Sequence, residues 1–167
     1  IEIKNISKSF GERNILDNVS LNINSGDSVA IIGQSGVGKS VLLKHINGLL
    51  KPDKGIVTVD GYDLNSLSFS KLQNIRKKMS MVFQFGALFD SMNIAENIGI
   101  AIDNLTNLKK KDKNKRIDES LKLVNLLETK DMLPSELSGG MKKRIGIARA
   151  ISIKPKYILY DEPTTGL

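Results

Sequence analysis

The chain has 167 residues, of which 40% are hydrophobic and 26% are charged, a composition that is ordinary for one globular domain with a core. It contains no cysteine, which excludes disulfides and cysteine–metal sites, and no apolar run approaches the ~18 residues of a membrane span. The net charge of +7 is compatible with a polyanionic partner: nucleic acid, an anionic membrane surface or nucleotide phosphates.

The first fifty residues predict short strands, a glycine-rich loop and a helix. Apolar and polar residues alternate in IEIKNISKSF (1–10) and NVSLNIN (18–24), which predicts antiparallel strands. The run SVAIIG (28–33) predicts a short buried strand that leads into the loop, and KSVLLKHINGLL (39–50) has a helical pattern.

The rest of the chain alternates between strand and helix patterns. We expect strands at GIVTVDG (55–61), MSMVFQ (79–84) and YILY (157–160), and helices between 93 and 153, where apolar residues recur at helical spacing. This order predicts an α/β core interrupted by a helical insertion. The core would comprise 1–92 and 154–167, and the insertion 93–153.

The loop GQSGVGKS (33–40) fits the pattern G-x-x-x-x-G-K-[ST] in full, between a predicted strand and a predicted helix. Its glycines let backbone N–H groups surround a phosphate, Lys39 can reach the β- and γ-phosphate oxygens, and Ser40 can bind Mg²⁺. The predicted nucleotide-binding residues are Gly33, Gln34, Ser35, Gly36, Val37, Gly38, Lys39, Ser40 and Val41. This loop predicts nucleotide binding and leaves kinases, GTPases and ATPases open.

Two acidic residues follow the last predicted strand. Ligands of open α/β sheets bind beyond the carboxyl ends of strands, where Asp161 and Glu162 are placed. Asp161 suits Mg²⁺, directly or through water, and Glu162 suits the general base that activates a water.

A second candidate phosphate site lies in ELSGGMKKR (136–144). Ser138 is a natural N-cap, and Gly139 and Gly140 leave the first backbone N–H groups of the following helix uncovered. Helix N-termini attract anions through these donors and the helix dipole.

Together these motifs resemble the ATP-binding cassette (ABC) ATPases. GQSGVGKS is similar to the family's Walker A motif, Gln84 to its Q-loop glutamine, LSGGM (137–141) to its signature, and ILYDEP (158–163) to its Walker B motif. Order and spacing agree along the whole chain. The resemblance implies a P-loop NTPase (RecA-like) α/β core with N-terminal antiparallel strands and an inserted α-helical subdomain.

The resemblance also implies how the motifs cooperate. Two cassettes pair head to tail, and Ser138, Gly139 and Gly140 of one would bind the γ-phosphate of the ATP held by the other. Glu162, Gln84 and Lys39 would be catalytic, and Ser40, Gln84 and Asp161 would face Mg²⁺. Phe10 falls where the family has an aromatic residue that stacks on adenine; a core phenylalanine is the alternative.

Finer features resemble the Mla/Mce-associated ABC ATPases, which power phospholipid transport in the bacterial envelope. These features are QFGALFDSM (84–92) and LSGGM in place of the commoner LSGGQ. The resemblance implies a homodimer that contacts a membrane permease through 85–98, with a periplasmic lipid-binding Mce-type subunit. It places the protein at the cytoplasmic face of the bacterial inner membrane.

Two other functions compete with this interpretation. A soluble ABC ATPase acting on nucleic acid or ribosomes would suit the lysine-rich KKKDKNKR (109–116), but no aromatic residues interleave with that run, and we expect no nucleic-acid partner. A P-loop kinase would need an acceptor site and a lid instead of LSGG.

We expect the sequence to be a piece of a longer protein, because it begins with Ile1 and ends directly after a strand-and-turn motif. The family's later aspartate-containing loop and switch histidine do not occur in it, so residues 1–167 alone should hydrolyse ATP weakly. We expect the single histidine, His45, to be structural.

Overall fold

A computed structural model describes residues 1–83 and 86–161. The chain divides into two compact units, Ile1–Arg76 and Lys77–Leu167. The predicted Gln84 and Glu162, together with Phe85 and 163–167, lie outside the described residues. No helix in the described ranges is long and apolar enough to span a membrane.

The first unit is built on an antiparallel sheet with strand order β2-β1-β3-β4. Val57 and Val59, two positions apart on β3, are almost fully buried on one face, because successive side chains point to opposite faces of a sheet. Ile3 and Ile6 on β1 are equally buried although three positions apart, because the pairing register with β2 shifts between them. The strands are β1 Glu2–Phe10, β2 Arg13–Asn22, β3 Lys54–Val59 and β4 Tyr62–Asp63. The predicted strands at 1–10, 18–24 and 55–61 are therefore confirmed.

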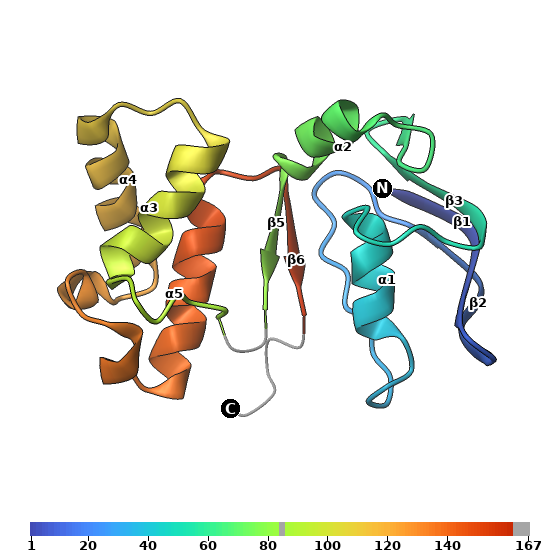
Figure 1. The fold of residues 1–167 in the computed structure, drawn as a ribbon, viewed down its shortest axis with the longest axis horizontal. Coiled ribbons are helices and arrows are strands. Elements are labelled where there is room, and N and C mark those ends of the chain that lie inside the picture. Colours follow the sequence, from blue (N-terminus) through green and yellow to red (C-terminus); the bar gives the residue numbers. More distant parts are fainter. Residues whose placement is uncertain (84–85, 162–167) are drawn as a thin grey trace. The chain divides into compact units, whose positions relative to one another are not determined.

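Two helices complete this unit: α1, Lys39–Ile46, and α2, Phe69–Arg76 (Figure 1). The α1 helix ends earlier than its sequence pattern predicts, because Gly48 follows with a left-handed φ of 68°. The α2 helix has a single buried residue, Ile75, and its weak apolar pattern was not predicted to form a helix.

The predicted buried strand at 28–33 is wrong. These residues have no regular secondary structure, and Ile32 is 93% exposed. A strand is held by hydrogen bonds to its neighbours, and none of the ladders among the described residues includes 28–33. An apolar run alone does not supply a pairing partner.

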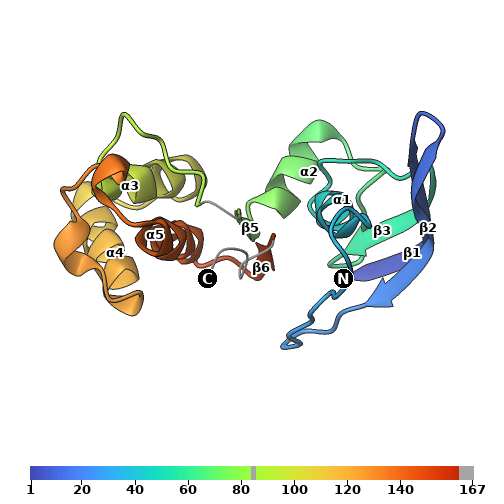
Figure 2. The same cartoon turned by 90° about the horizontal axis from the view of Figure 1, so that it is seen from below.

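The second unit contains two parallel strands, β5 Met79–Val82 and β6 Tyr157–Tyr160, as predicted. Its long helices are α3 Ile94–Leu105, α4 Lys110–Leu123 and α5 Gly139–Ser152, within the region predicted to be helical. They lie side by side in both ribbon views (Figures 1 and 2) and surround an apolar core. Two 3₁₀ turns, Leu127–Thr129 and Pro134–Glu136, lie between α4 and α5.

The helical core is formed by residues at helical spacing on each helix. Its fully buried members include Ile98, Leu121 and Ile145, one from each of the three helices. The α3 helix begins with a capping box in which Asn93 and Glu96 satisfy each other's backbone N–H groups.

Candidate functional site

The glycine-rich loop of the first unit is shaped by two glycines with left-handed φ. Gly36 has a φ of 80° and Gly38 a φ of 102°, a region that glycine adopts without strain. A Cβ on Gly38 would also lie 2.9 Å from Cγ2 of Ile15 and 3.0 Å from its carbonyl oxygen. Close packing on β2 therefore fixes the start of α1, the helix that follows the loop.

The start of α1 has the electrostatics of an anion site. No side chain caps it, and its first turn contains no acidic residue. The Lys39 ammonium lies over the loop and donates to the carbonyl oxygens of Gly33 at 2.9 Å and Gln34 at 2.7 Å. Loop N–H groups, helix dipole and lysine can therefore act on one phosphate chain.

The other predicted nucleotide residues of this unit are accessible. Gly33 to Val37 are exposed, and Ser40 and Val41 are half-buried. Phe10 ends β1 and is 49% exposed, with the Lys8 ammonium 5.6 Å from its ring centroid. Phe10 is thus not a core residue of the first unit.

His45, in contrast, is buried within α1, and its Nδ1 donates to the carbonyl oxygen of Val41 at 2.7 Å. His45 therefore lies in the core and bonds within its own helix, which agrees with the structural role expected from the sequence.

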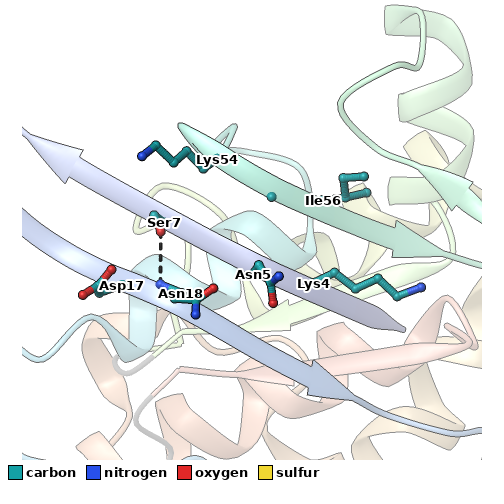
Figure 3. A pocket seen from close by; sticks show the side chains of 8 residues that line it. Lys4, Asn5, Ser7, Asp17, Asn18, Lys54 and Ile56 are labelled. Atoms are coloured by element: carbon teal, nitrogen blue, oxygen red, sulfur yellow. Dashed lines mark hydrogen bonds between the residues drawn. The ribbon is translucent and has the colours of Figure 1, made fainter.

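A hollow on β1, β2 and β3 lies elsewhere in the first unit (Figure 3). Its lining includes Lys4, Asn5, Ser7 and Asn18, and the Asn18 N–H donates to the Ser7 hydroxyl. None of the predicted nucleotide residues lines this hollow.

The second unit contains the signature segment at the start of α5. Ser138 is the N-cap, as predicted, and its Oγ accepts a hydrogen bond of 3.3 Å from the N–H of Met141. Gly139 and Gly140 are exposed, and a Cβ built on either would meet nothing within 4 Å. Packing among the described residues therefore gives no reason for glycine at these two positions.

Asp161 follows β6 directly, and its N–H donates to the carbonyl oxygen of Val82, so it extends the pairing with β5. Ser40, Asp161 and Gln84 offer a hydroxyl, a carboxylate and an amide oxygen, and such hard oxygen donors suit Mg²⁺. The described residues contain no cluster of three acidic or histidine side chains that could hold a metal by themselves.

Two polar residues of the second unit were missed by sequence reasoning. Asn97 is fully buried, and its amide binds the backbone of Phe89, Met92 and Asn93. The sequence could have indicated this role, because Asn97 lies on a helix face that is otherwise apolar, with Ile94 and Ile98.

The second is Arg149, in α5, which donates to the carbonyl oxygens of Gly86 and Ala87. Nothing local distinguishes it from the other basic residues of α5, since its partners lie 62 and 63 positions away.

Comparisons with known proteins agree with these features. The family described as "ABC transporter" matches residues 16–165. The methionine import ATP-binding protein MetN of Carboxydothermus hydrogenoformans is 45% identical over the whole chain, which covers 50% of MetN. The intermembrane phospholipid transport system ATP-binding protein MlaF of Escherichia coli is 40% identical over 99% of the chain, which covers 62% of MlaF.

Among solved structures, the dimeric ATP-binding cassette MJ0796, in a post-hydrolysis state bound to ADP and Pi, matches 99% of this chain with a TM-score of 0.90 and 36% identity. The match covers 75% of that cassette. The chain spans about half the length of the curated relatives that it matches, from 48% to 62%. Because the family match covers nearly the whole chain and includes its phosphate-binding loop, the chain belongs to the ATP-binding domains of the ABC transporter family.

Proposed function

We propose that this chain is the ATP-hydrolysing domain of a transporter subunit that works as a homodimer, with ATP bound between the P-loop of one copy and the signature of the other. The observation that carries the proposal is the open start of α5, where a Cβ built on Gly139 or Gly140 would meet no neighbouring atom of the described residues within 4 Å.

Glycine in a helix is less stable than alanine by about 1 kcal/mol, so two glycines in the first turn need a reason. Neither residue has a left-handed φ. The remaining reason for glycine is the close approach of another molecule to the backbone, and the N–H groups of Gly139 and Gly140 at the helix start favour an anion. An ATP held by a second copy provides that anion.

Each predicted residue then has a role in the attack of water on the γ-phosphate. Lys39 and the partner's Ser138 would stabilise charge on the phosphate, and Glu162 would accept a proton from the water. Ser40 and Asp161 would hold Mg²⁺, which supplies neutralising charge when bound. Gln84 would contact the ion or the water, and Phe10 would stack on adenine.

The test uses the full-length protein with Glu162→Gln. Loss of the base should lower hydrolysis by on the order of 10²–10⁴-fold and leave an ATP-bound dimer that light scattering detects. Glu162→Gln with Lys39→Ala is the matched control and should stay monomeric. A Glu162→Gln protein that remains monomeric in saturating ATP and Mg²⁺ would overturn the proposed dimer.

We further propose that the transported substrate is a phospholipid and that 85–98 contacts a permease at the cytoplasmic face of the bacterial inner membrane. The likeness to MlaF and the QFGALFDSM and LSGGM segments support this proposal. Phe89 is 50% exposed, although the buried Asn97 amide binds both its backbone N–H and its carbonyl oxygen. A fixed loop with an exposed aromatic ring suits a protein contact.

MetN, at 45% identity, makes import of an amino acid the competing substrate. The full-length chain should therefore be purified from native membranes in mild detergent, and its partners identified by mass spectrometry. A permease with an Mce-type periplasmic lipid-binding subunit would support lipid transport. A permease with an amino-acid-binding subunit would overturn the lipid proposal, and recovery of ribosomes or nucleic acid would overturn transport itself.

A further inference from the structure

The end of β1 is held by a carboxylate where its neighbouring strand β3 begins. Ser7 pairs with Lys54, the first residue of β3, and is the last β1 residue in that ladder. On the same side of β1, the Ser9 N–H donates to Oδ2 of Asp53 at 2.8 Å. The Asp53 N–H in turn donates to the carbonyl oxygen of Ser7 at 2.9 Å. Asp53, which lies between α1 and β3, therefore continues the pairing with its backbone and its side chain.

The other oxygen of the same carboxylate holds a lysine. The Lys8 ammonium donates to Oδ1 of Asp53 at 2.6 Å. The Lys8 side chain is 17% exposed, against 69% for the side chain of Lys4 on the same strand. A long lysine side chain has many rotamers, and the bond to Asp53 selects those that keep the ammonium close to the sheet.

Held in this way, the Lys8 ammonium lies over the ring of Phe10, 5.6 Å from the ring centroid. A cation within about 6 Å of an aromatic centroid is attracted by the electrons of the ring face. The ammonium therefore occupies one face of the Phe10 ring and restricts its rotation. Phe10 is 49% exposed, which leaves room for a second flat group.

Phe10 also lies close to the P-loop (33–40) of the same unit. A Cβ on Gly38 would lie 2.9 Å from Cγ2 of Ile15 and 3.1 Å from Cδ2 of Leu16. Leu16 is the β2 residue that pairs with Lys8. Phe10 is two residues further along β1, or about 7 Å at the rise of a strand. A nucleotide with its phosphates in the P-loop can therefore extend its base toward this ring.

We propose that Lys8 is a positioning residue for the nucleotide base: Asp53 holds the Lys8 ammonium on one face of Phe10, and adenine stacks on the other face. A ring that is oriented in advance loses less conformational freedom when the base binds. The inference rests on the proposed function, and it assigns Lys8 and Asp53 no contact with the phosphates. Loss of Lys8 should therefore weaken binding of the base and leave the hydrolysis step unchanged.

The experiment measures the affinities of the full-length protein for ADP and for pyrophosphate, both with Mg²⁺, by isothermal titration calorimetry. ADP carries a base and pyrophosphate does not, and neither ligand requires hydrolysis. The variants are Lys8→Met, Lys8→Arg, Asp53→Asn and Phe10→Ala. Lys4→Met is the matched control, because Lys4 is also on β1 and also pairs with a carboxylate, that of Glu2 at 2.9 Å. Melting temperatures show that each variant is folded at the assay temperature.

Lys8→Met should weaken ADP binding about 3- to 10-fold, because cation–π energies correspond to changes of this size, and should leave pyrophosphate binding unchanged. In ATP hydrolysis, KM should rise and kcat should not fall. Lys8→Arg should retain wild-type affinity, since a guanidinium both binds a carboxylate and stacks on a ring. Asp53→Asn should weaken ADP binding less than Lys8→Met, because the ammonium loses its anchor and keeps its charge. Lys4→Met should change neither affinity.

A double variant shows whether the lysine acts through the ring. Phe10→Ala should weaken ADP binding, and adding Lys8→Met to it should cause no further loss, because the contact is already absent. A lysine that attracted the phosphates instead would lower the pyrophosphate affinity in both backgrounds. That result would overturn the inference.

A folded Lys8→Met protein with wild-type or tighter ADP binding would also overturn the inference, while wild-type ATP hydrolysis upheld the proposed function. Unchanged ADP binding in Phe10→Ala would remove the adenine contact and the inference with it. A full-length wild-type protein that binds no ADP would overturn the proposed function itself. If Lys8→Met does not fold, Asp53→Asn decides the matter by the same comparison of ADP with pyrophosphate.

Discussion

At the scale of single residues, the second unit depends on a buried amide. Asn97 accepts from the Phe89 N–H at 2.7 Å and donates to the carbonyl oxygens of Phe89, Met92 and Asn93 at 2.9–3.0 Å. Buried backbone groups require such partners, because no water replaces a lost bond. One side chain therefore takes the place of regular secondary structure in 89–93.

Asn97→Ala should lower the free energy of unfolding by about 3 kcal/mol, because it leaves a buried N–H and several carbonyls with one partner fewer. Asn114→Ala, an exposed asparagine in α4, is the control and should change stability by no more than about 0.5 kcal/mol. Urea denaturation measures both. Equal stabilities of the two variants would contradict the role given to the Asn97 amide.

Asp53 gives the first unit a pH-dependent contact. Its carboxylate accepts from the Lys8 ammonium at 2.6 Å and from the Ser9 N–H at 2.8 Å, and these two bonds lower its pKa. A lowered folded-state pKa means that the unfolded state binds the proton more readily. The stabilisation is therefore complete above the unfolded pKa of about 4 and is lost as the pH falls through the folded pKa.

The stability difference between wild type and Asp53→Asn should accordingly be largest near neutral pH and should shrink as the pH falls below about 4. Denaturation at a series of pH values measures it, and high salt should reduce it because the pair is exposed. A difference that does not vary with pH would show that the carboxylate charge is not involved.

At the scale of elements, α5 contains glycines with opposite physical roles. Gly140 has open space around its Cβ position, whereas a Cβ on Gly146 would meet the backbone of Gly86 at 2.8 Å. Only Gly146 is explained by packing within the chain. Gly140 is the one expected to serve a second molecule.

Gly140→Ala should therefore raise the free energy of unfolding by about 0.5–1 kcal/mol and yet reduce ATP-dependent dimerisation. Gly146→Ala should lower the free energy of unfolding by about 1–3 kcal/mol through overpacking. Denaturation and light scattering on the full-length protein separate the two effects. Unchanged dimerisation in a stabilised Gly140→Ala protein would argue against the signature as a phosphate contact.

At the scale of the whole molecule, the proposed dimer makes each ATP site from two copies of the chain. A symmetric head-to-tail pair has two equivalent sites, each with one P-loop and the other copy's signature. Lys39→Ala and Gly140→Asp then affect opposite halves of a site. In a mixed dimer, both defects fall in one site and the second site is intact.

Neither variant should hydrolyse ATP alone, and mixing the two full-length proteins should restore activity. The rate of phosphate release measures the restored activity. Each variant alone is assayed at the same total protein concentration as the mixture. A mixture that stays inactive, while a tagged pull-down shows that mixed dimers form, would contradict the shared site.

Sequence reasoning succeeded where structure is local. The N-cap of α5 at Ser138 and the strand YILY at 157–160 were both predicted at the right positions, because caps and short apolar strands leave local patterns. The run 28–33 has an equally apolar pattern, yet it forms no strand. The two segments are equally apolar, but only 157–160 pairs with a neighbouring strand.

The sequence by itself therefore determined the proposed chemistry, because the glycines, lysine and serine of 33–40 and the Ser-Gly-Gly start of α5 would act through their own backbone and side chains. Only the tertiary structure decided which apolar runs pair as strands and which polar residues hold the loop after β5. Arg149 and Asn97 acquire their roles from backbone atoms brought to them by the packing of α3 and α5, and spacing along the chain does not encode such contacts.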